Sequence, residues 1–194
     1  NQHNLDKLTL AKAINFDLDS DKFVRESIFV HGSVDEVVEA IFQKFPQVMK
    51  KKIHEGLFEG SGDAKQVPLT NLHTLFTNLG TITFGLVTND SENNAIKHLE
   101  QHNLTQYFDM IIGYDSGYGS KPEPGQLEAF LRKTNLLSQE VLMIGDSTYD
   151  LVAANKISMP CLGVLSGTAN KKDLSAHTPF IIDRIDELEE RLEE

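Results

Sequence analysis

Residues 141–150 read VLMIGDSTYD, and this stretch carries both a fold signal and a chemical signal. The apolar run Val141–Ile144 is followed at once by Gly145 and Asp146, and a second acid, Asp150, comes four residues later. This order is typical of a strand that ends at a sheet edge, where glycine lets the backbone turn closely before a helix. The two acids can then approach one cation, or they can simply cap the start of the helix.

Short apolar runs of this kind alternate with helical patterns along the chain. This alternation predicts an α/β fold with a Rossmann-like three-layer core around a parallel sheet. Strands are expected at 13–17, 82–87, 110–113, 141–144, 160–165 and 180–182. Helices are expected at 69–79, 91–102, 123–134, 150–156 and 185–192.

One stretch after the first strand breaks the alternation, because two helical patterns follow each other with no strand between them. Ser33 and Glu36 open the first pattern as a capping box, and the second follows Pro46. The apolar stripe of the second pattern comprises Val48, Met49, Ile53, Leu57 and Phe58. Residues 59–63, EGSGD, read as a flexible return linker. We therefore expect a small helical cap, although the two helices can also be read as ordinary core helices. The expected division is a core of residues 1–23 and 66–194 and a cap of residues 24–65.

Polar side chains follow three further expected strands. Asp17 and Asp19 follow the first strand, Thr88 and Asn89 the second, and Lys121 the third. Taken singly, these residues read as a solvated turn, a helix cap and a solvated lysine. However, ligands bind at the carboxyl ends of the strands in open parallel sheets. Acid, hydroxyl, amine and paired acids in this order therefore predict phosphoryl transfer.

Four motifs stand in sequence: Phe16-Asp17-Leu18-Asp19, Val87-Thr88-Asn89, Lys121-Pro122 and Ile144-Gly145-Asp146-Ser147-x-x-Asp150. In this order and spacing the chain resembles the haloacid dehalogenase superfamily. The likeness is greatest to the branch that contains phosphoglycolate phosphatase and β-phosphoglucomutase, and it covers nearly the whole chain.

The resemblance implies a Mg²⁺-dependent phosphatase that hydrolyses small phosphate monoesters. Asp17 would be the nucleophile and form an aspartyl-phosphate, Asp19 would be the general acid and base, and Lys121 would neutralise charge. Substrate contacts would come from Leu18, Thr88, Asn89 and Lys121. The metal site would comprise Asp17, Asp19, Asp146 and Asp150.

The first motif departs from the family pattern, because Ser20 and Asp21 stand where the family has Gly and Thr. Asp21 adds a third carboxylate, which either folds outward or lowers activity by repelling the phosphate. Asp19 favours a phosphatase or phosphomutase over a dehalogenase, since an alkoxide leaving group needs a proton and a halide does not. The alternatives are a catalytically degenerate binding or regulatory protein and a phosphomutase.

The acidic composition restricts the partners. With 18 Lys and Arg against 29 Asp and Glu, the formal net charge is -11, which argues against nucleic acid. No apolar run reaches the length of a membrane span, and the polar N-terminus lacks a signal-peptide core. One cysteine, Cys161, fits a reducing compartment. We expect a cytoplasmic monomer or homodimer whose partner is a small phosphorylated metabolite.

Overall fold

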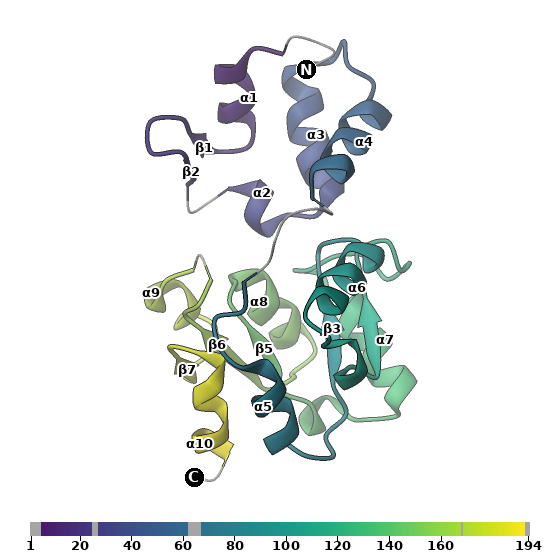
Figure 1. Ribbon diagram of the computed structural model, residues 1–194, viewed down its shortest axis with the longest axis vertical. Coiled ribbons are helices and arrows are strands. Elements are labelled where there is room, and N and C mark those ends of the chain that lie inside the picture. Colours follow the sequence, from purple (N-terminus) through teal and green to yellow (C-terminus); the bar gives the residue numbers. More distant parts are fainter. Residues whose placement is uncertain (1–4, 25–26, 62–66, 168, 193–194) are drawn as a thin grey trace. The chain divides into compact units, whose positions relative to one another are not determined.

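The computed structural model describes residues 5–24, 27–61, 67–167 and 169–192 of the chain (Figure 1). The chain divides into two compact units, unit 1 with residues 1–64 and unit 2 with residues 65–194. The expected grouping of residues 1–23 with 66–194 as one core, and of 24–65 as a cap, stays a prediction.

Unit 1 is a small helical body with one short hairpin. Its elements are α1 (Lys7–Ala13), β1 (Phe16–Asp17), β2 (Lys22–Phe23), α2 (Ile28–His31), α3 (Val34–Lys44) and α4 (Lys50–Ser61). The expected capping box is confirmed, because Ser33 Oγ accepts from the Glu36 N–H and Glu36 Oε2 accepts from the Ser33 N–H at 2.8 Å. The apolar faces of α3 and α4 then form a core with residues from α1 and α2.

The strand expected at 13–17 is wrong in its length and in its pairing. Residues 7–13 form helix α1, so the strand expected at 13–17 shortens to β1. The sequence KLTLAKA contains mostly good helix formers, and Asp6 caps the helix by accepting from the Thr9 N–H at 2.9 Å. β1 then pairs antiparallel with β2, a strand that the sequence did not indicate.

The second helical stripe of unit 1 also needs correction. Val48, Ile53 and Leu57 join the core as expected, but Met49 is 61% exposed. Met49 precedes the first residue of α4, so helical spacing does not apply to it. The linker expected at 59–63 begins too early, because α4 continues to Ser61. The last two residues of that expected linker, 62 and 63, lie outside the described residues.

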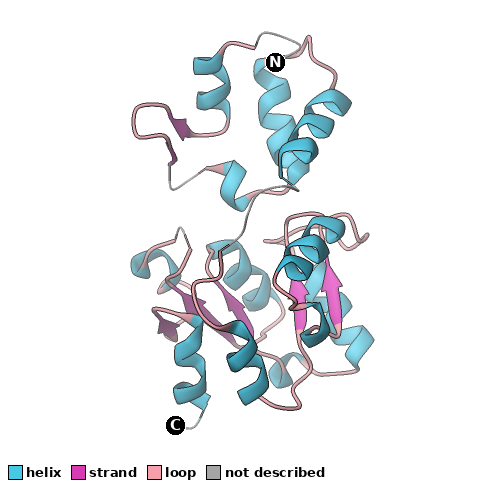
Figure 2. Ribbon diagram, in the orientation of Figure 1, coloured by secondary structure: helices cyan, strands magenta, loops and turns pink. Residues whose placement is uncertain are grey.

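Unit 2 carries parallel strands flanked by helices, so the α/β class is confirmed (Figure 2). Its helices are α5 (Leu72–Asn78), α6 (Glu92–Gln101), α7 (Gly125–Thr134), α8 (Thr148–Lys156), α9 (Lys171–Leu174) and α10 (Leu188–Leu192), with 3-10 turns η1 (Thr105–Tyr107), η2 (Ser138–Glu140) and η3 (Ile185–Glu187). Its strands are β3 (Gly85–Val87), β4 (Met110–Ile112), β5 (Met143–Gly145), β6 (Cys161–Val164) and β7 (Ile181–Ile182). β3 pairs parallel with β4, and β6 pairs parallel with both β5 and β7. The five strands expected after the first are confirmed in shorter form, and they form two sheets.

Two successive residues of β6 show the layers of the larger sheet. Cys161 packs into a cluster with Leu151 of α8 and Leu174 of α9. Leu162 packs on the opposite face, in a cluster with Leu188 of α10. Because successive strand side chains point to opposite faces, helices cover both sides of this sheet. The three-layer arrangement expected from the sequence is therefore present in unit 2.

Helix α7 joins the two sheets of unit 2. Its Phe130 packs with Ile112 of β4, and its Leu127 packs with Met143 of β5. Gly85 of β3 makes the close approach possible, because a Cβ there would lie 2.5 Å from the Phe130 ring.

Among the described helices, none combines the length and the apolar content that crossing a membrane requires.

The core of unit 2 gives a direct stability prediction. Leu151 is 0% exposed, so Leu151→Ala should lower the free energy of unfolding by about 3 kcal/mol through lost burial and a residual cavity. Leu137, which is 66% exposed, is the matched control, and its change to Ala should cost less than about 0.5 kcal/mol. Urea unfolding followed by circular dichroism measures both. Equal losses for the two variants would contradict the packing described here.

Candidate functional site

The side chain of Lys121 connects the two sheets of unit 2. Its ammonium donates to the Val87 carbonyl oxygen at 2.9 Å and to Asp150 Oδ1 at 2.6 Å. Val87 is the last residue of β3, and Asp150 lies in the first turn of α8, directly after β5. Lys121 is 8% exposed and Asp150 5%. A charge pair as buried as this one tolerates little movement, because each ion alone would be costly in that environment.

Asp150 is held on its other side by the start of its own helix. Its Oδ2 accepts from the Ser147 N–H at 3.1 Å and from Ser147 Oγ at 2.8 Å, which completes a capping box. Gly145 leaves room for this carboxylate, because a Cβ at Gly145 would lie 2.3 Å from the Asp150 Cβ. The glycine of the 141–150 stretch therefore allows α8 to begin close against the end of β5.

Asn89 fixes the backbone of Lys121. The Asn89 Nδ2 donates to the Lys121 carbonyl oxygen at 2.8 Å, and the Lys121 N–H donates to Asn89 Oδ1 at 2.8 Å. The family resemblance implies that Asn89 contacts the phosphate. In the structure, the Asn89 side chain forms hydrogen bonds with the peptide groups of Lys121. The Asn89 carboxamide thus positions the lysine from which the ammonium extends.

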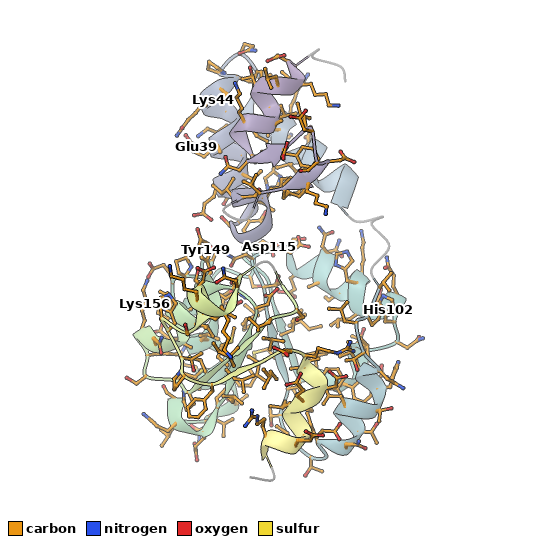
Figure 3. All side chains as sticks on the ribbon, turned by 90° about the vertical axis from the view of Figure 1, so that its left-hand side faces the viewer. Glu39, Lys44, His102, Asp115, Tyr149 and Lys156 are labelled. Atoms are coloured by element: carbon orange, nitrogen blue, oxygen red, sulfur yellow. The ribbon has the colours of Figure 1, made fainter. Side chains whose placement is uncertain are left out.

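The loop that leads to Lys121 is anchored to α6. The Glu92 N–H donates to Asp115 Oδ1 at 2.8 Å, and Ser116 Oγ donates to Glu92 Oε2 at 2.5 Å. Figure 3 labels Asp115 in this loop, which follows β4. Gly113 permits the contact, since a Cβ there would lie 2.1 Å from the Glu92 nitrogen. The start of α6 thereby restricts the path of the chain from β4 to Lys121.

Thr88 lies at the carboxyl end of β3 with its backbone fully engaged. Its N–H donates to the Ile112 carbonyl oxygen at 3.0 Å, and its carbonyl oxygen accepts from Gln126 Nε2 at 2.8 Å. The Thr88 hydroxyl oxygen accepts from the Asp90 N–H at 3.0 Å. This arrangement leaves the hydroxyl proton to be donated to a ligand.

Asp146 follows β5 and is exposed, and its carboxylate lies against the loop that follows β6. A Cβ at Gly167 would lie 1.9 Å from Asp146 Oδ2, so only glycine leaves space for that carboxylate. The side chains of Asp146 and Asp150 therefore extend from the same turn toward different neighbours. Nothing in the sequence near Gly167 indicates this requirement, because the contact joins positions 21 residues apart.

The acidic pair of the first motif belongs to unit 1. Asp17 ends β1, and its Oδ1 accepts from the Asp19 N–H at 2.9 Å. Its Oδ2 accepts from Ser20 Oγ at 2.7 Å. The hydrogen bond from Ser20, followed by that from Asp19, lowers the pKa of the Asp17 carboxyl, which is therefore ionised at neutral pH. Asp21 is exposed and has φ 54°, a left-handed conformation that Asp tolerates better than most residues.

Unit 2 thus assembles most of the residues singled out from the sequence. Lys121 directly contacts the β3 end and Asp150, and Asn89 contacts Lys121. Asp17, Leu18 and Asp19 lie in unit 1. Within residues 5–24, 27–61, 67–167 and 169–192, no three His, Cys, Asp or Glu side chains are grouped closely enough to hold a metal ion. The expected metal set draws on both units.

Comparison with protein families matches residues 14–164 to the haloacid dehalogenase-like hydrolases. The matched segment covers most of the chain and includes all four motifs. The chain belongs to the haloacid dehalogenase-like hydrolase family. The resemblance inferred from the motifs is therefore confirmed.

Relatives and solved structures within this family show how far the likeness extends. Phosphoglycolate phosphatase of Vibrio parahaemolyticus is 34% identical over 107 residues, which cover 55% of this chain and 47% of that relative. The chain spans about half the length of the curated relatives it matches. The crystal structure of a predicted phosphoglycolate phosphatase from Haemophilus somnus has a TM-score of 0.75 at 17% identity, covering 95% of this chain and 89% of that one. L-2-haloacid dehalogenase from Xanthobacter autotrophicus has a TM-score of 0.62 at 13% identity, covering 82% and 75%. These two structures share the fold.

The contacts of Lys121 predict a large loss of stability when its charge is removed. Lys121→Met should lower the free energy of unfolding by about 3–5 kcal/mol, because Asp150 would keep a buried and unpaired charge. Urea unfolding of the purified protein measures this loss.

Lys156, labelled in Figure 3, is the matched control. It pairs with Glu123 at 2.7 Å, but the two side chains are 39% and 72% exposed. Lys156→Met should therefore cost less than about 1 kcal/mol. An equal loss of unfolding free energy for Lys121→Met and Lys156→Met would show that the buried pair of Lys121 contributes no more than an exposed ion pair.

Proposed function

We propose that the chain is a Mg²⁺-dependent phosphatase that hydrolyses small phosphate monoesters through an aspartyl-phosphate. Membership of the hydrolase family and the likeness to phosphoglycolate phosphatases support this proposal. The observation that carries it is the buried ammonium of Lys121 at the carboxyl ends of β3 and β5. Phosphoryl transfer depends mainly on positioning and on charge neutralisation, and this arrangement supplies both.

Lys121 retains the capacity to bind a phosphoryl oxygen. An ammonium has three N–H donors, and the bonds to Val87 and Asp150 use two of them. The third N–H and the hydroxyl proton of Thr88 are the donors that we assign to the phosphate. Because Asp150 and Asn89 already restrain the lysine, little reorganisation is needed when the substrate binds.

In the proposed reaction, one carboxylate oxygen of Asp17 attacks phosphorus and the bond from phosphorus to the ester oxygen breaks. Asp19 donates its proton to the leaving alkoxide, which departs as an alcohol. The Asp19 carboxylate then takes a proton from water, and the resulting hydroxide attacks the phosphorus of the aspartyl-phosphate. Inorganic phosphate leaves, and both Asp17 and protonated Asp19 are restored.

The donor chemistry fits a hard divalent cation. Asp17, Asp19 and Asp146 offer oxygen ligands of the kind that Mg²⁺ prefers, and Asp17 is ionised at neutral pH. Both oxygens of Asp150 already accept hydrogen bonds from Lys121 and Ser147, so we assign Asp150 to the lysine instead of the metal. Mg²⁺ bound to these ligands would offset the negative charge that the carboxylates and the phosphate bring together.

A phosphatase assay tests the proposal. The protein should release phosphate from p-nitrophenyl phosphate and 2-phosphoglycolate with Mg²⁺ present, and it should lose this activity in EDTA. Asp17→Asn should lower kcat by about a thousandfold or more, because the amide is not a nucleophile.

Asp21→Asn is the control, since it removes an exposed neighbouring carboxylate that we place outside the reaction. It should keep kcat within about threefold of the wild-type value. Undiminished turnover by Asp17→Asn would rule out the nucleophile. Failure of the wild-type protein on a wide panel of phosphate esters would favour a binding protein, and an isomeric sugar phosphate as product would favour a mutase.

A further inference from the structure

Gln126 is a buried polar residue that the family motifs do not explain. It is the second residue of α7 and is 0% exposed. Its Nε2 donates to the Thr88 carbonyl oxygen at 2.8 Å, whereas its buried Oε1 has no hydrogen-bond partner among the described residues. The next residue, Leu127, is a core side chain.

Stability alone does not account for this glutamine. A buried carbonyl oxygen without a partner is unfavourable, and an apolar side chain of the same length would avoid that cost. What an apolar residue cannot supply is the N–H that holds Thr88. The amide is therefore best explained by its contact with the residue that follows β3.

The contacts of the neighbouring residues show what the amide adds. The Lys121 ammonium donates to the carbonyl oxygen of Val87, and the Lys121 peptide groups form hydrogen bonds with the side chain of Asn89. The Gln126 side chain donates to the carbonyl oxygen of Thr88, the residue between Val87 and Asn89. Residues 87, 88 and 89 thus each form a hydrogen bond with the segment 121–126. Without the Gln126 amide, Thr88 would lose its hydrogen bond to that segment.

The Thr88 carbonyl belongs to the peptide that joins Thr88 to Asn89, so the Gln126 amide fixes the start of the chain segment that leads to Asp90. The hydroxyl oxygen accepts from the Asp90 N–H, so its proton points elsewhere. A turn of this peptide would displace the Asp90 N–H and so remove the hydrogen bond that orients the Thr88 hydroxyl.

We propose that Gln126 is a positioning residue that holds the hydroxyl of Thr88 in place to bind the phosphoryl group of the substrate. This inference rests on the proposed function and adds a residue to its phosphate site. Thr88 would contact the phosphoryl oxygens both before and during the reaction. Loss of its orientation should therefore weaken binding more than it slows the chemical step.

Gln126→Met tests the inference, because methionine keeps the length of the side chain and removes the N–H donor. KM for p-nitrophenyl phosphate and the inhibition constant of inorganic phosphate should each rise about tenfold, while kcat should change less than about threefold. Gln101→Met is the matched control, since Gln101 is exposed at the end of α6. It should leave all three constants unchanged.

Hydrogen exchange gives a readout that needs no activity. The Asp90 amide, which donates to the Thr88 hydroxyl oxygen, should exchange about tenfold faster in Gln126→Met than in the wild-type protein. Unchanged exchange at Asp90 would overturn the inference, whether or not the wild-type protein is a phosphatase. So would an unchanged KM in an active variant whose melting temperature alone had shifted. If the wild-type protein hydrolyses no ester, the proposed function fails, and exchange at Asp90 decides the positioning role alone.

Discussion

A buried ammonium must be surrounded by acceptors, and in this protein that requirement connects the two sheets of unit 2. Moving a charge away from water costs several kcal/mol in proteins, and only close partners offset that cost. Lys121 has two such partners, the carboxylate of Asp150 at 2.6 Å and the carbonyl oxygen of Val87 at 2.9 Å. The contact therefore fixes the end of β3 relative to the start of α8. Gly145 and Asn89 then serve the same pair, one by leaving space for the acid and the other by holding the backbone of the lysine.

The same constraint prepares the chemistry that we propose. A site that neutralises phosphate is effective when its donors are already oriented before the substrate arrives. Lys121 is restrained through its ammonium and its backbone, and Thr88 is restrained through its N–H, carbonyl and hydroxyl groups. Ser20, which departs from the family motif, donates to Asp17 and so favours the ionised form of the proposed nucleophile. The departure therefore supports the carboxylate, and the added acid, Asp21, is exposed.

Sequence patterns predicted those parts of the protein that depend on neighbours along the chain. The apolar runs located β3 to β7, and the Ser33 cap follows from its spacing of three residues to Glu36. Two of the features that escaped prediction depend on distant contacts. Gly167 is needed only because Asp146 lies against it, and a glutamine on a helix such as Gln126 normally indicates a wet surface. The strand expected at 13–17 failed for a local reason, since a capped run of helix formers occupies residues 7–13.

The most direct test of this account is a double-mutant cycle on the buried pair, with Lys121→Met and Asp150→Asn made singly and together. Asn keeps an oxygen for the Ser147 cap, so the cycle isolates the interaction of the two charges. Urea unfolding gives the free energy of each variant. We predict that the double variant is more stable than the sum of the single losses implies, with a coupling energy of about 2–3 kcal/mol. Losses that add within about 0.5 kcal/mol would show that Lys121 and Asp150 do not depend on each other, and the central claim would fall.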